Sequence, residues 1–160
     1  MIVSNATPLI AFARIGELAL LQKVVGSLVI PAGVADEIMA YEQEKQGSIA
    51  LAKEAWIQMK TVQSEQQIKL LMPTLDRGEA EVIVLSLESQ AQLVLMDELT
   101  GRKVAESLNL KVTGSMGVLI RAKQLGQITT VEPYVQHMKQ AGIYFSDRFI
   151  QAVLSQVGEL

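Results

Sequence analysis

Oxygen-bearing side chains follow three short apolar runs of this sequence. Asn5 follows MIVS, Asp97 follows QLVLM, and Thr113, Gly114 and Ser115 follow LKV. If these runs are parallel strands, their carboxyl ends meet at one edge of the sheet, where open α/β sheets bind ligands. Oxygen ligands suit Mg²⁺ or Mn²⁺, and an ion that keeps free coordination positions can hold phosphate and activate water. The chemistry indicated is phosphodiester hydrolysis.

Two pairs of acids lie on helices that begin near this edge. Asp36 and Glu37 follow the strand SLVI, and Glu79 and Glu81 lie in a helix that opens at Arg77. Residues i and i+2 do not share a helix face, so we expect only one acid of each pair to point inward. In the second pair we expect that acid to be Glu79, because it is nearer the helix start and the strand ends.

Other catalytic chemistries lack their usual residues. The chain has no cysteine, which excludes thiolate metal sites, disulfides and cysteine nucleophiles, and its one histidine, His137, lies in a late helical pattern where we expect a surface or packing role. Nucleophile-elbow and glycine-rich phosphate-loop motifs do not occur. A formal charge of -3 argues against coating nucleic acid by bulk electrostatics.

The elements that must position these side chains alternate between strand and helix. The apolar runs, including WIQMKTV, read as strands buried on both faces, and Pro8 and Pro31 can lie in the first turns of helices. Two possible capping boxes occur, at Ser64 with Gln67 and at Asp76 with Glu79. Further helices are expected over residues 79–88, 100–108, 115–125, 131–140 and 147–157. This pattern predicts a three-layer α/β fold with a mostly parallel central sheet flanked by helices.

Length and composition set the remaining expectations. A chain of 160 residues fits one domain, residues 1–160, with a core of Leu, Ile, Val, Ala and Met. No apolar run reaches the length of a membrane span and the start does not look like a signal peptide, so we expect a soluble cytoplasmic protein. The polar stretch Tyr41–Gly47 is expected to be a helix end and an exposed connection.

Nearly the whole chain resembles the PIN-like domain family of metal-dependent nucleases, to which many toxin–antitoxin ribonucleases belong. The similarity is to a prokaryotic, poorly characterised subgroup. The resemblance is carried by the segments SNATPLIAFARIGEL, VIPAGVADEI, LDRGEAEVIVLSLE, LVLMDELTGRKVAESLNLKVTGSMGVLIRAK and AGIYFSDRFIQAVL. It implies cleavage of single-stranded RNA by water activated by one or two divalent ions, and a possible antitoxin protein as partner.

The family's site residues match particular positions of this chain. Its four acidic positions, which serve as catalytic and metal-binding residues, fall on Asn5, Glu37, Glu79 and Asp97, and two small hydroxyl positions fall on Thr7 and Ser115. From their charge, four basic side chains are candidates for phosphate contacts: Arg102, Lys103, Arg121 and Lys123.

Asn5 departs from the family, whose members usually have aspartate there. An amide oxygen can still bind a metal, but one negative charge is lost, and a unit-charge interaction near 4 Å is worth roughly 4 kcal/mol at an effective dielectric of about 20. The remaining carboxylates repel each other less, which reduces the loss. We therefore predict weakened metal binding and weakened or lost activity.

Each position also has a structural explanation. Asp97 could cap the following helix, Glu79 could be the third residue of a capping box, Glu37 could be a solvated surface acid, and Asn5 could stabilise a turn. The basic side chains could lie on solvated helix faces.

Two other functions stay open. One is a catalytically inactive module that binds RNA or protein, motivated by Asn5. The other is a small metal-dependent phosphatase, but this chain lacks the DxD nucleophile pattern expected of a common class of α/β phosphatases. A homodimer through apolar helices such as residues 115–125 is also compatible with the sequence.

Overall fold

The computed structural model describes residues 1–41 and 47–160. Its strands are β1 (Ile2–Ser4), β2 (Leu28–Ile30), β3 (Ile57–Met59), β4 (Leu93–Leu95) and β5 (Val112–Thr113). Its helices are α1 (Ala6–Arg14), α2 (Leu18–Val25), α3 (Ala32–Tyr41), α4 (Glu65–Leu71), α5 (Arg77–Ser89), α6 (Leu99–Ser107), α7 (Ser115–Gln124), α8 (Glu132–Gln140) and α9 (Asp147–Gln156), with a 3₁₀ turn at Leu51–Lys53. The expected connection Tyr41–Gly47 falls mostly on residues 42–46, outside the described residues.

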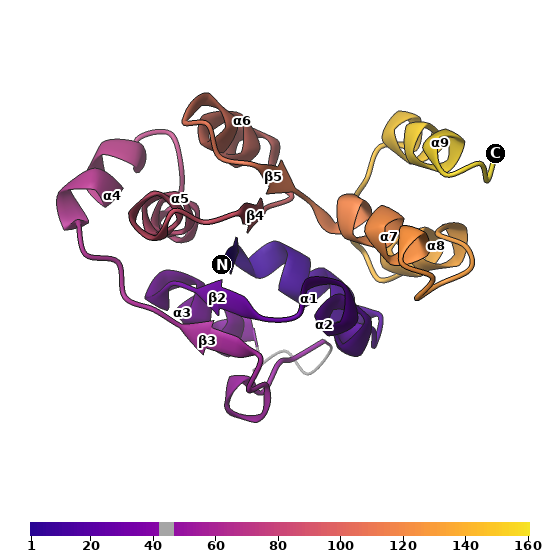
Figure 1. Ribbon diagram of the computed structural model, residues 1–160, viewed down its shortest axis with the longest axis horizontal. Coiled ribbons are helices and arrows are strands. Elements are labelled where there is room, and N and C mark those ends of the chain that lie inside the picture. The colour runs from indigo at the N-terminus through magenta and orange to yellow at the C-terminus, as the bar shows by residue number, and fades with distance from the viewer. Residues whose placement is uncertain (42–46) are drawn as a thin grey trace.

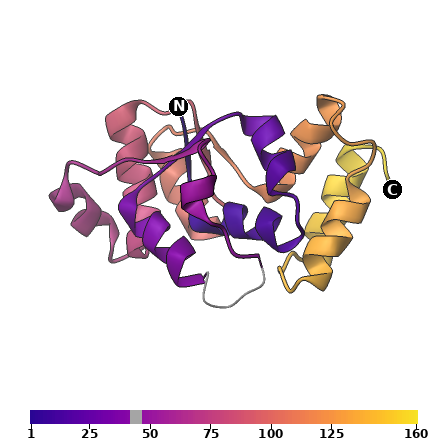
Figure 2. The ribbon, with the colours of Figure 1, turned by 90° about the horizontal axis from the view of Figure 1, so that it is seen from below.

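The strands form one sheet in the order β3-β2-β1-β4-β5, and each of the four strand pairs that the structure describes is parallel. Helices flank this sheet, so the expected three-layer α/β fold is confirmed. Figure 1 shows α4, α5 and α6 on the left and α7, α8 and α9 on the right, and Figure 2 separates the same two groups. The chain runs outward from β1 in both directions, which makes the β1–β4 boundary the point where the strand order reverses. In open α/β sheets this is where ligands bind.

Helix starts follow the chemistry of their first residues. Asp76 and Glu79 form a full capping box at α5, as predicted, whereas at α4 the Ser64 hydroxyl accepts from the backbone N–H of Gln67. Pro8 lies in the first turn of α1, and Pro31 lies one residue before α3. The expected helices are therefore present, with ends shifted by one or two residues.

One local expectation was wrong, and one helix was missed. The run WIQMKTV forms only three residues of strand, Ile57–Met59, and the last ladder bond comes from Lys60 N to Ile30 O at 2.9 Å. The helix α2 was not expected, because its sequence LALLQKVV is short and mostly apolar. It ends at Gly26, whose φ of 78° is in the region that glycine adopts without strain.

Helix α5 is buried on nearly all sides. It contacts the sheet at β1 and β4 and is packed against α3, α4 and α6, and residues 78–86 are all buried. Both Glu79 and Glu81 are consequently inside, so the expectation that only one of them points inward was wrong. The two acids do point to different neighbours, as a separation of two residues requires.

The described helices include none that is long and apolar enough to cross a membrane.

Candidate active site

The three strand ends that carry polar side chains lie side by side. The backbone N–H of Asn5, after β1, donates to Leu95 O of β4 at 2.9 Å. The N–H of Met96, after β4, donates to Thr113 O of β5 at 2.9 Å. The parallel register thus brings Asn5, Asp97 and Ser115 to one edge of the sheet, as the sequence predicted.

Asp97 is held by the start of α7. Its Oδ1 accepts from the backbone N–H of Ser115 at 2.7 Å, and its Oδ2 accepts from the Ser115 hydroxyl at 2.6 Å. A Cβ at Gly114 would lie 2.5 Å from Asp97 Oδ1, so only glycine leaves room for this carboxylate. Asp97 does not cap α6. That role belongs to Glu98, which accepts from Gly101 N at 3.0 Å.

Asn5 precedes α1 at the capping position without capping it. The side chain is buried, with 4% of its surface exposed, and its Oδ1 accepts no hydrogen bond from any residue that the structure describes. The turn-stabilising role considered for Asn5 is therefore not provided by this oxygen. A buried carbonyl oxygen without a donor is costly in an apolar environment, which makes it available to a ligand.

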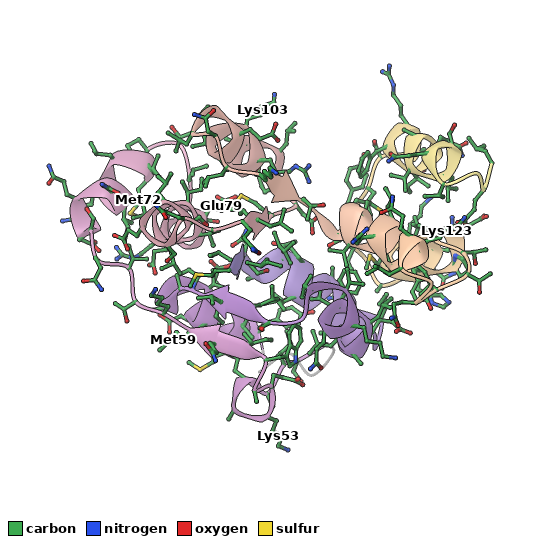
Figure 3. The ribbon with its side chains drawn as sticks, in the orientation of Figure 1. Lys53, Met59, Met72, Glu79, Lys103 and Lys123 are labelled. Carbon is green, nitrogen blue, oxygen red and sulfur yellow. The ribbon has the colours of Figure 1, made fainter. Side chains whose placement is uncertain are left out.

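Glu79 serves its own helix and also faces α6. Its Oε1 accepts from Asp76 N at 3.0 Å, which completes the capping box, and its Oε2 lies 3.4 Å from where a Cβ of Gly101 would be. Figure 3 shows Glu79 on the part of α5 that lies beside α6 and β4. Burial raises the pKa of this carboxyl and the negative charges of Asp76 and Glu98 raise it further, while the Asp76 amide opposes the shift.

Glu37 reaches from α3 to the start of α5. Its Oε1 lies so close to Gly78 that a Cβ there would collide with it. Glu37 keeps an exposed side, yet partial desolvation, followed by the charges of Asp76, Glu79 and Glu81, raises its pKa from 4.5 to about 7. It is therefore an exposed acid whose carboxyl lies against the start of α5, and it is not part of the Asp97 contacts.

Glu81 joins two helices. Its Oε1 accepts from Gly33 N at the start of α3 at 3.0 Å, and its Oε2 pairs with Arg77 at 2.8 Å. Arg77 also pairs with the exposed Glu65 at 2.7 Å. The sequence reasoning passed over Glu81, because burial of both acids is visible only when all the neighbours of α5 are known.

A cavity of about 920 Å³ opens beside Asp97. Its walls come from α1, the start of α6, the β5–α7 junction, α9 and the segment before α9. It brings together Thr7, Asp97 and Arg102, and a guanidinium N–H of Arg102 donates to Met96 O at 3.3 Å.

The candidate residues therefore form two adjoining sets. We call the cavity-lining residues Thr7, Asp97 and Arg102, together with Ser115, which donates to Asp97 from behind the lining, the cavity group. We call the second set the α5 group, and its members are Glu37, Asp76, Glu79, Glu81 and Glu98.

The other basic candidates lie away from the cavity. Lys103 is exposed on the outer side of α6 (Figure 3). Arg121 contacts Gln124 at 3.4 Å on the exposed side of α7. Lys123 is tied to the C-terminal segment, donating to Val157 O at 2.7 Å and pairing with Glu159 at 2.9 Å. Of the four basic side chains expected at phosphate, only Arg102 lines the cavity.

A family model described as a PIN domain matches residues 1–159. The chain belongs to the PIN domain family. No curated protein and no solved structure matches it in the corresponding comparisons. The resemblance noted in the sequence is thus confirmed, and the parallel sheet is the PIN-like α/β architecture. PIN domains have a nuclease-type fold and generally depend on divalent metal.

The oxygen atoms of this PIN domain site are of the kind that hard cations bind. The oxygen of Asn5 is buried without a donor, and the carboxylates of the α5 group repel one another, a situation that a cation relieves. Across residues 1–41 and 47–160, however, no three Asp, Glu or His side chains gather closely enough to hold a metal by themselves. A metal ion held here would need at least one oxygen besides these side chains, and Asn5 Oδ1 is a buried oxygen without a donor.

The aromatic part of the cavity wall was missed by the sequence reasoning. Tyr144, Phe145 and Phe149 line it, next to Ile143. The segment GIYFSDRF was noted only as part of the family resemblance. Its density of aromatic residues, in a chain with 4% aromatic content, was the signal that could have found this wall.

Proposed function

We propose that this protein is a metal-dependent endoribonuclease of the PIN family that cleaves single-stranded RNA, with activity weakened by Asn5. The observation that carries the proposal is the unpartnered, buried Oδ1 of Asn5 on the strand next to the one that ends at Asp97. An oxygen left without a donor at the switch point of an α/β sheet is a feature that folding stability alone disfavours.

Mg²⁺ or Mn²⁺ would be held by oxygens of Asn5, Glu79 and Asp97, with Glu37 acting directly or through water. When bound, the ion supplies activation of water and neutralisation of phosphate charge. Glu37 is suited to hold a proton near neutral pH, because its pKa is about 7. We assign it the orientation or deprotonation of the attacking water.

The protein's own groups would position the phosphate. Arg102 lines the cavity beside Asp97, and the Thr7 hydroxyl lies on the opposite helix, α1. Helices α1 and α7 both begin at this edge of the sheet, and the N-terminal ends of helices attract anions. These groups would favour binding of a phosphodiester at the mouth of the cavity even though the chain carries a net charge of -3.

The test compares the parent chain with Asn5→Asp and Asp97→Asn. Mn²⁺ binding is measured by calorimetry, and metal-dependent cutting is measured on single-stranded RNA. We expect Asn5→Asp to tighten Mn²⁺ binding by tenfold or more, because the added charge is worth up to roughly 4 kcal/mol before repulsion among the carboxylates is subtracted. Cleavage should rise in Asn5→Asp and disappear when Asp97→Asn is added.

Lys103→Ala is the matched control, since Lys103 is exposed and adjacent in sequence to the cavity residue Arg102. It should leave both measurements unchanged. The proposal fails if Asn5→Asp neither tightens Mn²⁺ binding nor produces cleavage that depends on Asp97.

A catalytically inactive module that binds RNA or protein is the second candidate. It is favoured by the two hydrogen bonds that Ser115 donates to Asp97, because each carboxylate oxygen then has a donor without a metal. RNA binding without cleavage in both the parent chain and Asn5→Asp would support it. A toxin role, with an antitoxin partner, additionally requires that Asn5→Asp arrests growth and that a neighbouring gene product relieves the arrest.

A further inference from the structure

Two sets of side chains line the cavity. We call Thr7, Asp97 and Arg102 its polar end. We call the residues of α7, α9 and the segment before α9 its aromatic end; they are mostly apolar or aromatic but include Ser146 and Gln156. Cavities of this size bind small organic groups, typically with a few polar contacts and a larger apolar wall. The two ends therefore suit a ligand that joins a charged group to flat apolar groups.

The aromatic end is more exposed than folding requires. Tyr144 is 84% exposed and Phe149 is 44% exposed, although both are large side chains that gain stability from burial. The rings of Phe145 and Phe149 are tilted against each other, with centres 6.2 Å apart. Tyr144 presents much of its ring to solvent, and it lines the cavity together with Phe149.

The polar end indicates what kind of ligand the aromatic end takes. An apolar helix of a protein partner would have to cover Asp97 and Arg102 and remove both charges from water, at a cost that apolar contacts do not offset well. A single RNA strand offers phosphates for Arg102 and unpaired bases for the aromatic rings. The arrangement thus matches a single-stranded nucleic acid better than an apolar helix.

We propose that Tyr144 and Phe149 form a stacking platform for the unpaired bases of single-stranded RNA whose backbone passes Arg102. This rests on the proposed function for its choice of RNA as ligand, and it adds residues that the sequence reasoning did not assign. Stacking tolerates any base, so the platform gives affinity for unpaired strands without a strong sequence preference.

The experiment measures RNA binding without metal, so that it does not depend on cleavage. Fluorescence anisotropy in EDTA compares a labelled single-stranded octamer of RNA with an octamer of the same backbone that lacks bases. Tyr144→Ala should weaken binding of the normal octamer by about tenfold, the usual effect of losing one stacked base. Tyr144→Phe should bind like the parent chain, because it keeps the ring. The parent should bind the base-free strand more weakly than Tyr144→Ala binds the normal one, because the base-free strand stacks on neither Tyr144 nor Phe149.

Two controls separate the outcomes. Leu70→Ala removes an apolar side chain that is 73% exposed on α4, outside the cavity, and should change nothing. Arg102→Ala should weaken both strands equally. The platform is overturned if Tyr144→Ala binds the normal octamer like the parent chain, or if the base-free strand binds as well as the normal one.

Other results distinguish the two proposals. A parent chain that binds no RNA in EDTA, with an Asn5→Asp variant that cleaves RNA with Mn²⁺, would overturn the platform and leave the nuclease proposal standing. If Tyr144→Ala loses base-dependent binding but Asn5→Asp does not cleave RNA, the platform stands and the nuclease proposal fails. A dimer in sedimentation that Tyr144→Ala dissociates would show that a second copy covers the rings, which also overturns the platform.

Discussion

Asp97 in the cavity group and Glu81 in the α5 group are both carboxylates that accept a backbone N–H at the start of another helix. Asp97 accepts from Ser115 at 2.7 Å, and Glu81 accepts from Gly33 at 3.0 Å. Glu81 is 5% exposed and its charge is paired with Arg77 at 2.8 Å, whereas no ion pair joins Asp97 to any described residue, although it lines the cavity. The same kind of backbone hydrogen bond is therefore found in two different settings. The charge of Glu81 is paired with Arg77 inside the fold, whereas the charge of Asp97 has no cationic partner among the described residues and can interact with a ligand in the cavity.

The largest effect in this comparison should come from Glu81→Ala. It leaves the Gly33 N–H without its acceptor and removes the buried half of the Arg77 pair, so we expect the free energy of unfolding to fall by about 2 kcal/mol. This corresponds to a drop of about 4–8 °C in Tm, measured by thermal unfolding.

Glu65→Ala is the matched control, because Glu65 is the exposed partner of the same arginine. Its effect on the free energy of unfolding should be much smaller than that of Glu81→Ala, because an exposed ion pair contributes little. Equal losses in the two variants would contradict the structural role given to Glu81.

A pair of glycine substitutions should separate the cavity group from the α5 group by activity. In the Asn5→Asp background, Gly114→Ala places a Cβ 2.5 Å from Asp97 Oδ1 and should lower Mn²⁺ affinity and RNA cleavage by about tenfold. Gly33→Ala places a Cβ 2.7 Å from Glu81 Oε2 and should lower Tm while the folded enzyme keeps its activity. Calorimetry and cleavage assays below both Tm values check this, and loss of activity in both variants would remove the distinction.

The smallest effect concerns the titration of Glu37. Because its pKa is raised from 4.5 to about 7, the folded chain keeps a proton that the unfolded chain has released in that window. Stability contributed by this group therefore falls as pH rises from about 4.5 to about 7, and the penalty is complete above that range. Since Glu37 is partly exposed, we discount the penalty for screening to about 1 kcal/mol.

Glu37→Gln should therefore match the parent chain at pH 4 and be more stable by about 1 kcal/mol at pH 8. Chemical denaturation at the two pH values without metal measures the difference. Glu79, whose pKa is also raised, should leave part of the slope in place. If Glu37→Gln has the same pH dependence of stability as the parent chain, then partial burial and the neighbouring acids do not raise the pKa of Glu37.

Much of the fold could be read from the sequence because its signals are local. Apolar runs indicated the five strands, although β3 proved shorter, and the capping box at Asp76 and Glu79 was recognisable from two residues. The edge position of Asn5 and Asp97 followed from the parallel arrangement alone. The helix α2 was missed, because eight mostly apolar residues carry too little periodicity to tell a helix from a strand.

The site could be read only in part. The sequence indicated that Asn5, Asp97 and Ser115 follow neighbouring strand ends. It expected Lys123 at phosphate, whereas that lysine pairs with Glu159, 36 residues later in the chain. It also expected one of Glu79 and Glu81 to face solvent. Both errors concern side chains whose partners come from distant segments.

The sequence alone was enough for the alternation of strands and helices apart from α2, for the PIN family, and for the replacement of an acidic site position by Asn5. The folded structure was needed to show that Asn5 Oδ1 has no donor among the described residues, that Ser115 donates to Asp97, and that exposed aromatic rings line the cavity beside Asp97. The physical reason is that propensity and capping act over a few neighbouring residues. Burial and pairing of a side chain depend on every element that packs around it.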